Sequence, residues 1–178
     1  MQLQREHHFP TQDHPQLVAQ WLHEHLPGAP AARRALLRHA SRTLIKAGDA
    51  QVLKAWGLGA SFKGSATLAV APARVDLGGE VTFKLHLQSN AKRAQLLAID
   101  YVVHHVKAHG GTSPKVFKGW QIELPPGAEV TLKKRHSLRP VTTRRYHAGC
   151  HGVAVQINGR MVAEGSFMLR LPKGVAHG

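Results

Sequence analysis

The chain has 178 residues, of which 43% are hydrophobic and 19% charged, a balance typical of a globular protein and not of a disordered one. Its 24 Lys and Arg against 10 Asp and Glu give a formal net charge of +14, which predicts an anionic partner, nucleic acid before an acidic lipid surface. Cys150 is the only cysteine, so no intrachain disulfide can form. No apolar run reaches the ~18–20 residues of a membrane span and no signal-peptide pattern is present, so we expect a cytoplasmic protein with no membrane contact.

Residues 1–57 have the apolar spacing of α-helices. In the first predicted helix Asp13 is the N-cap and Pro15 lies in the first turn. The second helix ends at Gly48, and Asp49 caps a short third helix. The pattern predicts one terminal HEAT-like repeat, an incomplete solenoid that cannot bury its apolar face alone.

From about residue 66 the apolar period changes to two, as in "EVTFKLHLQ", and "HGGTSPK" (109–115) is predicted to be a turn. The dipeptide Asn158-Gly159 predicts a two-residue turn between the last two strands. About seven short strands in roughly 105 residues indicate an antiparallel β-sandwich of immunoglobulin type. The expected division of the chain is as follows: helical repeat 1–57, linker 58–65, sandwich 66–173 and tail 174–178.

Tyr146, in "YHAGCH", is expected to have a structural role in this sandwich. Its hydroxyl would form a hydrogen bond to the backbone at the corner where a strand begins, as tyrosines of immunoglobulin-type sandwiches do. The cysteine pair of antibody domains is absent, so the sandwich would depend on packing alone.

The most unusual stretch is "KKRHSLRPVTTRRY", residues 133–146, with six basic residues and no acidic one. Alternatively, these residues form a solvated edge strand whose charges prevent aggregation, but one or two charges are enough for that purpose. The run therefore predicts phosphate contacts, which we assign to Lys133, Arg135, Arg139, Arg144 and Arg145. Because a lysine is costly to bury, we expect the inward alternation to break near Lys134, by a bulge or at the core's edge.

Other polar residues carry weaker signals. Arg34, Arg38 and Arg42 follow each other at a spacing of four, which places them in one row on a helix that either faces solvent or binds phosphates. The 14 histidines contain no helical HExxH-type pair, so no metal site is expected. Cys150 is interpreted as a buried or neutral strand residue and not as a nucleophile.

Three long segments resemble the C-terminal region of AlkC-type DNA alkylation repair proteins: "LLRHASRTLIKAGDAQVLKAWG", "DYVVHHVKAHGGTSPKVFK" and "KKRHSLRPVTTRRYHAGCHGVAVQINGR". Those proteins are HEAT-like-repeat DNA glycosylases with an appended immunoglobulin-like domain, and the resemblance covers nearly the whole chain after about Asp13. It implies removal of N-alkylated bases without base flipping, by repeats that cradle the duplex while the sandwich closes on it. It also implies that Lys115, in the segment 109–115, faces DNA.

The family's catalytic carboxylates belong to repeats that precede the helices present here. The helical residues offer only Glu6, Asp13, Glu24 and Asp49, and none matches a catalytic position, so no catalytic residue and no cofactor is expected. The sequence thus predicts the DNA-binding C-terminal portion of a repair protein, with double-stranded DNA and the missing upstream HEAT-like repeats as partners. Two alternatives remain: a basic β-sandwich that binds proteins, and a chain that is itself an alkylbase DNA glycosylase.

Overall fold

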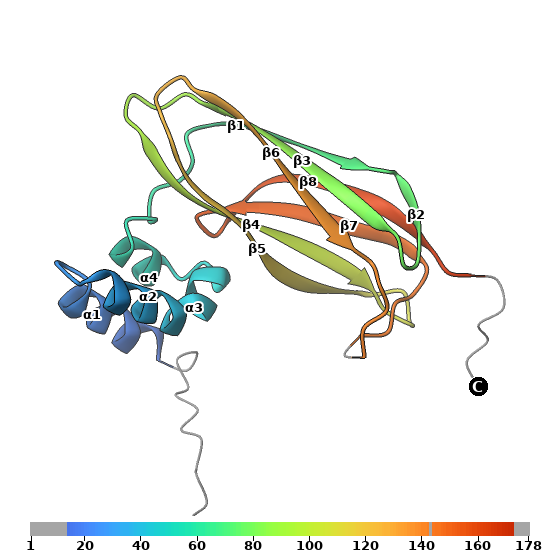
Figure 1. The fold of residues 1–178 in the computed structure, drawn as a ribbon, viewed down its shortest axis with the longest axis horizontal. Helices are drawn as coiled ribbons and strands as arrows, with labels where there is room; N and C mark the ends of the chain where they lie inside the picture. The colour runs from blue at the N-terminus through green and yellow to red at the C-terminus, as the bar shows by residue number, and fades with distance from the viewer. Residues whose placement is uncertain (1–13, 143, 173–178) are drawn as a thin grey trace, which may run out of the picture. The chain divides into compact units, whose positions relative to one another are not determined.

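The computed structural model of the chain describes residues 14–142 and 144–172. The contacts divide the chain into two compact units, Met1–Ala60 and Ser61–Gly178, the first helical and the second built of strands (Figure 1). This division falls within the segment 58–65 that was expected to be a linker. Leu58 on one side of this division is fully buried, and the first strand begins at Gly64 on the other side.

The helical unit contains four short helices: α1 (Pro15–His25), α2 (Ala31–Ala40), α3 (Arg42–Ala47) and α4 (Ala50–Ala55). Pro15 lies in the first turn of α1, and the Asp49 carboxylate accepts a hydrogen bond of 2.9 Å from the Val52 N–H at the start of α4, both as predicted. Asp13 lies outside the described residues. No helix in the described part of the chain has the length and apolar character needed to cross a bilayer.

The prediction of one continuous second helix is wrong, because the chain breaks at Ser41 between α2 and α3. The buried Ser41 hydroxyl donates a hydrogen bond of 2.8 Å to the Leu37 carbonyl, one turn back. It also accepts a hydrogen bond of 2.9 Å from the Trp56 indole N–H. A serine that bonds the i−4 carbonyl bends a helix, and here the bend brings the hydroxyl to Trp56.

The second unit is a two-layer β-sandwich, which confirms the predicted fold class (Figure 1). Its eight strands are β1 (Gly64–Ala71), β2 (Arg74–Asp76), β3 (Glu80–Ser89), β4 (Gln95–Val106), β5 (Thr112–Leu124), β6 (Glu129–Ser137), β7 (Gly149–Ile157) and β8 (Arg160–Arg170). One sheet has the order β1-β3-β6 and the other β2-β8-β7-β4-β5. The pairing is antiparallel except for the short β2, which runs parallel to β8. β5 and β6 are therefore edge strands of different sheets.

The predicted turn at residues 109–115 is displaced in the structure. The tight connection lies between Lys107, whose N–H donates a hydrogen bond of 2.8 Å, and Gly111, whose carbonyl accepts it. Thr112 already begins β5, so Lys115 lies on a strand and not in a loop.

The core forms between the two sheets and follows the alternation seen in the sequence. On β3, Val81, Phe83, Leu85 and Leu87 are all buried. The turn at Asn158-Gly159 is confirmed, with φ of 50° and 74° at the two residues. The Asn158 side chain also joins this hairpin to β4: its Oδ1 accepts from the Ala98 N–H at 2.9 Å and its Nδ2 donates to the Leu96 carbonyl at 3.2 Å.

The position of Lys134 tests the expectation that the inward alternation of β6 breaks near this residue. The β3–β6 register runs from Glu80 opposite Ser137 to Gln88 opposite Glu129 without a shift, so the expected bulge is absent. Lys134 lies opposite Phe83 on the inward face and is half-buried. The inward alternation continues through Lys134 to the buried His136, so the expected break near Lys134 does not occur. Because β6 is an edge strand, Lys134 lies at the margin of its sheet, where its side chain is only half-buried.

Candidate nucleic-acid interface

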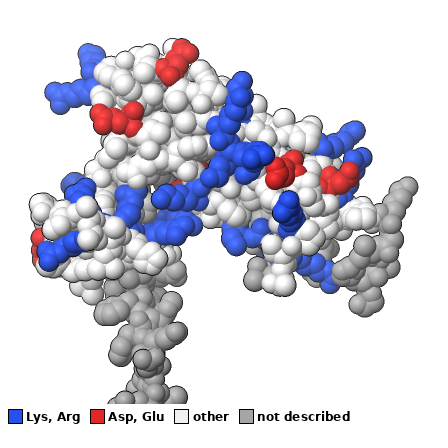
Figure 2. Space-filling view, in the orientation of Figure 1, with Lys and Arg blue, Asp and Glu red and all other residues white. Residues whose placement is uncertain are grey.

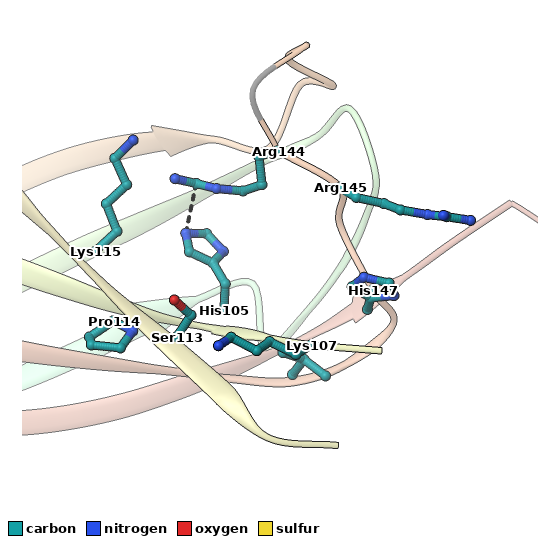
Figure 3. A pocket seen from close by; sticks show the side chains of 9 residues that line it. His105, Lys107, Ser113, Pro114, Lys115, Arg144, Arg145 and His147 are labelled. Carbon is teal, nitrogen blue, oxygen red and sulfur yellow. Dashed lines mark hydrogen bonds between the residues drawn. The ribbon is translucent and has the colours of Figure 1, made fainter. Parts of the chain in front are cut away.

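A pocket of about 260 Å³ opens where β4 ends and β5 begins. The connection between β6 and β7 runs past it and contributes side chains from the basic run (Figure 3). Its lining residues are His105, Val106, Lys107, Ser113, Pro114, Lys115, Arg144, Arg145 and His147. These residues include two lysines and two arginines and no carboxylate.

Arg144 is the most constrained of these side chains. Its Nη1 lies 2.7 Å from Nε2 of His105, the contact drawn in Figure 3. Its guanidinium carbon lies 5.8 Å from the centre of the Tyr146 ring, within cation–π range. Its backbone N–H donates a hydrogen bond of 3.2 Å to the Val141 carbonyl. Arg144 is therefore held in place by contacts from its own connection and from β4.

The imidazole of His105 is neutral when it accepts the hydrogen bond from Arg144. Because an arginine has only donors, Nε2 must accept this hydrogen bond, which leaves the proton on Nδ1. Burial, and then the positive charge of Arg144, lowers the pKa of His105 to about 3, so the ring stays neutral at physiological pH. The charge of Lys115, which lines the same pocket, lowers the pKa of His105 in the same direction.

His105 belongs to a group of three buried histidines at this end of the core. His136 lies against Phe83 and Phe117, and its Nδ1 is 3.3 Å from the Tyr101 hydroxyl. Burial, and then the charge of Arg144, lowers the pKa of His136 to about 4.

The third histidine, His151, donates a hydrogen bond of 3.0 Å to the His147 carbonyl and stacks on Phe167. Burial lowers its pKa as well. Within the described residues, no group of three or more His, Cys, Asp or Glu side chains is placed to hold a metal ion. Cys150 was expected to be a buried or neutral strand residue; it lies on strand β7, and its side chain is exposed, so burial is excluded.

Tyr146 contacts its surroundings through its ring. The ring packs edge-on to His105 at 5.8 Å, lies beside the Arg144 guanidinium, and is partly buried against the core. The predicted hydrogen bond from its hydroxyl is not among the contacts in the described part of the chain. Its structural role thus rests on packing around Arg144.

The structure brings together Lys115, Arg144 and Arg145 from the predicted set, and it adds Lys107. Figure 3 shows Arg144 reaching over His105 toward the side of Lys115, whereas Arg145 extends in the opposite direction. Both Arg144 and Arg145 also line a neighbouring pocket of about 260 Å³, together with Pro140 and Leu171. Lys107 was missed because it lies outside the basic run, and only the pairing of β4 with β5 brings it to this pocket.

Lys133 and Arg135 lie elsewhere, exposed on the outward face of β6. Lys133 is directly opposite Lys84 on β3, and like charges in such a pair destabilise a sheet. Arg135 lies 3.8 Å from the Glu80 carboxylate. Lys84 was not predicted as a binding residue, because local alternation does not show that β3 pairs with β6. Figure 2 shows Lys and Arg side chains at several places on this unit, with Asp and Glu among them.

Arg139 is exposed just beyond β6, where its backbone N–H donates a hydrogen bond of 3.3 Å to the Ser137 hydroxyl. In the helical unit, Arg34 and Arg38 lie over the Trp56 ring at 5.9 and 4.9 Å. Arg42 begins α3, so the three arginines do not form a row on one helix. The aromatic ring gives Arg34 and Arg38 a structural contact that the sequence did not reveal.

The described carboxylates of the helical unit have local contacts. Glu24 accepts a hydrogen bond of 3.1 Å from the Gln20 amide, and Asp49 caps α4. Glu6 and Asp13 lie outside the described residues. Nothing in this geometry assigns a catalytic role to either described carboxylate.

Comparisons with known proteins agree with this architecture. The family model described as "Uncharacterised protein YhaZ, C-terminal Ig-like domain" matches residues 64–171. The uncharacterized protein YhaZ of Bacillus subtilis (strain 168) is 32% identical over 127 residues, which cover 71% of this chain and 35% of that protein.

Among solved structures, the Pseudomonas fluorescens alkylpurine DNA glycosylase AlkC, bound to DNA containing an abasic site analog, matches with a TM-score of 0.81 and 32% identity. The match covers 90% of this chain and 45% of that one. A β-glucosidase from Listeria innocua, 16% identical with a TM-score of 0.50 over 64% of this chain and 17% of that one, shares the sandwich fold alone. The chain spans less than half the length of each of these three proteins. Through residues 64–171 it belongs to the family with the YhaZ-type C-terminal Ig-like domain, and it is a protein of the AlkC and YhaZ type.

Proposed function

We propose that this chain is the DNA-binding C-terminal portion of an AlkC-type DNA alkylation repair protein, and that it holds duplex DNA through phosphate contacts. The observation that carries the proposal is the pocket that Lys107, Lys115 and Arg144 line and whose lining contains no carboxylate. The similarity to AlkC, a glycosylase solved with DNA, supports DNA as the anion. Phosphate contacts of this kind position a protein on the duplex and carry no direct base information.

A second basic surface supports the same function. Lys84 and Lys133 face each other on the outer side of the β1-β3-β6 sheet, beside Arg135. Their mutual repulsion is unfavourable in the free protein, and a bound phosphate would offset it. Arg144 adds preorganisation, because a guanidinium already held by His105 loses less entropy when it binds.

The helical unit is proposed to stack on further HEAT-like repeats that precede it in a longer protein. Large apolar residues on α1 and α2 are exposed: Leu17 at 62%, Trp21 at 40% and Leu36 at 64%. A solenoid repeat normally buries such residues against its neighbour. In this proposal the preceding repeats supply the catalytic carboxylates.

The salt dependence of duplex binding tests the proposal. Fluorescence anisotropy with a labelled duplex of random sequence, repeated over roughly 50–300 mM salt, gives the slope of log Kd against log salt concentration. We expect a steep, linear loss of affinity, with a slope of about 0.9 for each phosphate contact. Absence of binding at low salt, or an affinity that does not change with salt, would contradict the proposal.

A further inference from the structure

We infer that the pocket lined by Lys107, Lys115 and Arg144 binds one phosphate group of the DNA backbone, and that His105 is a positioning residue that directs Arg144 toward it. This inference rests on the proposed function, because it names one phosphate contact that the sandwich makes. It concerns a side chain, His105, that is buried in the core and does not itself have to touch DNA.

The charges of the pocket have no counterion in its lining. Arg135 forms a salt bridge with Glu80 and Arg170 forms one with Asp76, and none of these four residues lines the pocket. Lys115 and Arg144 line the same pocket, so their positive charges repel each other. A phosphate between them would relieve this repulsion, and a pocket of about 260 Å³ has room for it.

The pocket also offers a neutral hydrogen-bond donor. Ser113 on β5 lies directly opposite His105 on β4, and its side chain lines the same pocket. A hydroxyl beside lysine and arginine donors is a common partner of phosphate oxygens. In Figure 3 the ends of the Lys115 and Arg144 side chains lie on one side of the His105 ring, and Ser113 and Lys107 lie on the other.

The hydrogen bond from Arg144 to His105 fits a positioning role. A guanidinium has five N–H donors in one plane, and the bond to Nε2 engages one donor on Nη1. Other donors can then bind a phosphate through two parallel hydrogen bonds, the geometry in which arginine surpasses lysine. Nδ1 of His105 has no hydrogen-bond partner in the described structure, a cost that holding Arg144 would explain.

A double-mutant cycle tests the role of His105 in the full chain. Arg144→Ala should weaken duplex binding by roughly five- to tenfold near 0.1 M salt and reduce the salt slope by about 0.9, the effect of one lost contact. His105→Phe keeps a ring in the core and leaves the charge of the protein unchanged at neutral pH, yet it should reproduce both effects. The variant with both substitutions should bind no more weakly than Arg144→Ala alone.

His105→Gln is the conservative control, because its amide oxygen can still accept from Arg144. We expect it to retain most of the affinity and the full salt slope. A merely structural histidine would instead lower the melting temperature of both His105 variants and leave the slope unchanged. Wild-type binding by His105→Phe, or effects of His105→Phe and Arg144→Ala that add, would overturn the inference.

If His105→Phe fails to fold, Arg144→Lys still tests the contact between Arg144 and the phosphate. Lysine preserves the charge but loses the planar fork, so we expect a several-fold loss of affinity at an unchanged melting temperature. An affinity equal to that of the wild type would overturn the bidentate contact. Arg145→Ala is a matched comparison from the same connection, and its effect on affinity should be smaller, because that side chain extends away from Arg144.

Two further arms identify the source of the phosphate and separate this inference from the proposed function. A dumbbell duplex without ends should bind as tightly as a linear duplex with 5′-phosphates, and dependence on a free end would overturn the assignment to the backbone. Lys84→Ala combined with Lys133→Ala tests the outer face of the β1-β3-β6 sheet. If only that variant weakens a salt-dependent binding, the pocket inference fails and the proposed function stands. If the wild type shows no salt-dependent binding, the proposed function itself fails.

Discussion

Among single residues, Arg144 connects the core of the sandwich to its surface. Its guanidinium bonds a buried imidazole on one side and lies over the Tyr146 ring on the other. The sequence identified Arg144 as one of a run of basic residues. It could not identify the partner, because His105 lies 39 positions earlier and reaches Arg144 only through the folded sandwich.

The first prediction concerns Tyr146. Since its contacts are made by the ring, Tyr146→Phe should change the free energy of unfolding by less than about 0.5 kcal/mol, not by the roughly 1 kcal/mol of a lost hydrogen bond. Tyr146→Ala should cost roughly 2 kcal/mol, because it removes a half-buried ring. Urea denaturation of both variants gives these values. Equal costs for Phe and Ala would show that the hydroxyl carries the stabilisation.

The second prediction concerns the three buried histidines. Their pKa values are lowered in the folded state, to about 3 for His105 and about 4 for His136, and downward for His151. As pH falls below about 6.5, the unfolded chain takes up protons that the folded chain does not, so stability present above this pH is lost. Each group contributes up to about 1.4 kcal/mol per pH unit in this range.

Denaturant midpoints between pH 7.5 and pH 5 test this prediction. We expect the free energy of unfolding to fall steadily with pH, and to fall less steeply in His136→Phe, which lacks one of the three groups. His109→Asn, in the exposed turn after β4, is the matched control and should keep the slope of the wild type. Stability that is the same at pH 5 and pH 7.5 would contradict the assignment of neutral histidines.

At the scale of elements, the alternation of β3 and the Asn158-Gly159 turn were predicted correctly because both are local. The segment of β1 alternates only weakly and β2 has three residues, so neither was among the strands singled out from sequence. The start of β5 was assigned to a turn because "GGTSP" has turn composition. The break at Ser41 accompanies a hydrogen bond from the Trp56 indole, a contact between residues 15 positions apart that helical periodicity cannot predict.

The third prediction concerns the hairpin between β7 and β8. Asn158 has a positive φ and two side-chain hydrogen bonds to β4. Asn158→Gly keeps the favourable backbone and loses both bonds, so it should cost about 1–3 kcal/mol. Asn158→Ala adds the strain of a left-handed alanine, roughly 1 kcal/mol more. Thermal or chemical denaturation gives the order of the two variants, and a less costly alanine would show that the turn does not constrain this residue.

For the whole molecule, composition showed that the strand-rich unit is basic. It did not show that the basic residues lie on two separate surfaces. The basic run contributes to a pocket beside β4 and β5, and separately to the outer face of β6. Consecutive residues of a strand face opposite sides, so a continuous run cannot form one surface along β6. The assignment of each residue to a side required the register with β3.

The fourth prediction concerns catalysis. We expect no release of 3-methyladenine or related bases from alkylated DNA by this chain alone. Both described carboxylates of the helical unit are engaged in local contacts, and the chain spans 45% of the glycosylase that it resembles. An alkylated base is a good leaving group, so modest electrostatic assistance would be detectable. Release that disappears in Glu24→Gln would contradict this prediction.

The central claim, that the basic residues beside the pocket bind DNA phosphates, is tested most directly by one matched pair of double variants. Arg144→Ala with Arg145→Ala removes two charges beside the pocket, and Arg93→Ala with Arg160→Ala removes two exposed charges at the other end of the sandwich. The measurement is the salt slope of duplex binding, together with the melting temperature. We predict that the first variant reduces the slope by roughly one for each lost contact at a nearly unchanged melting temperature, while the control keeps the slope. An unchanged slope in the first variant, with a large drop in melting temperature, would show that these arginines serve the fold and not DNA.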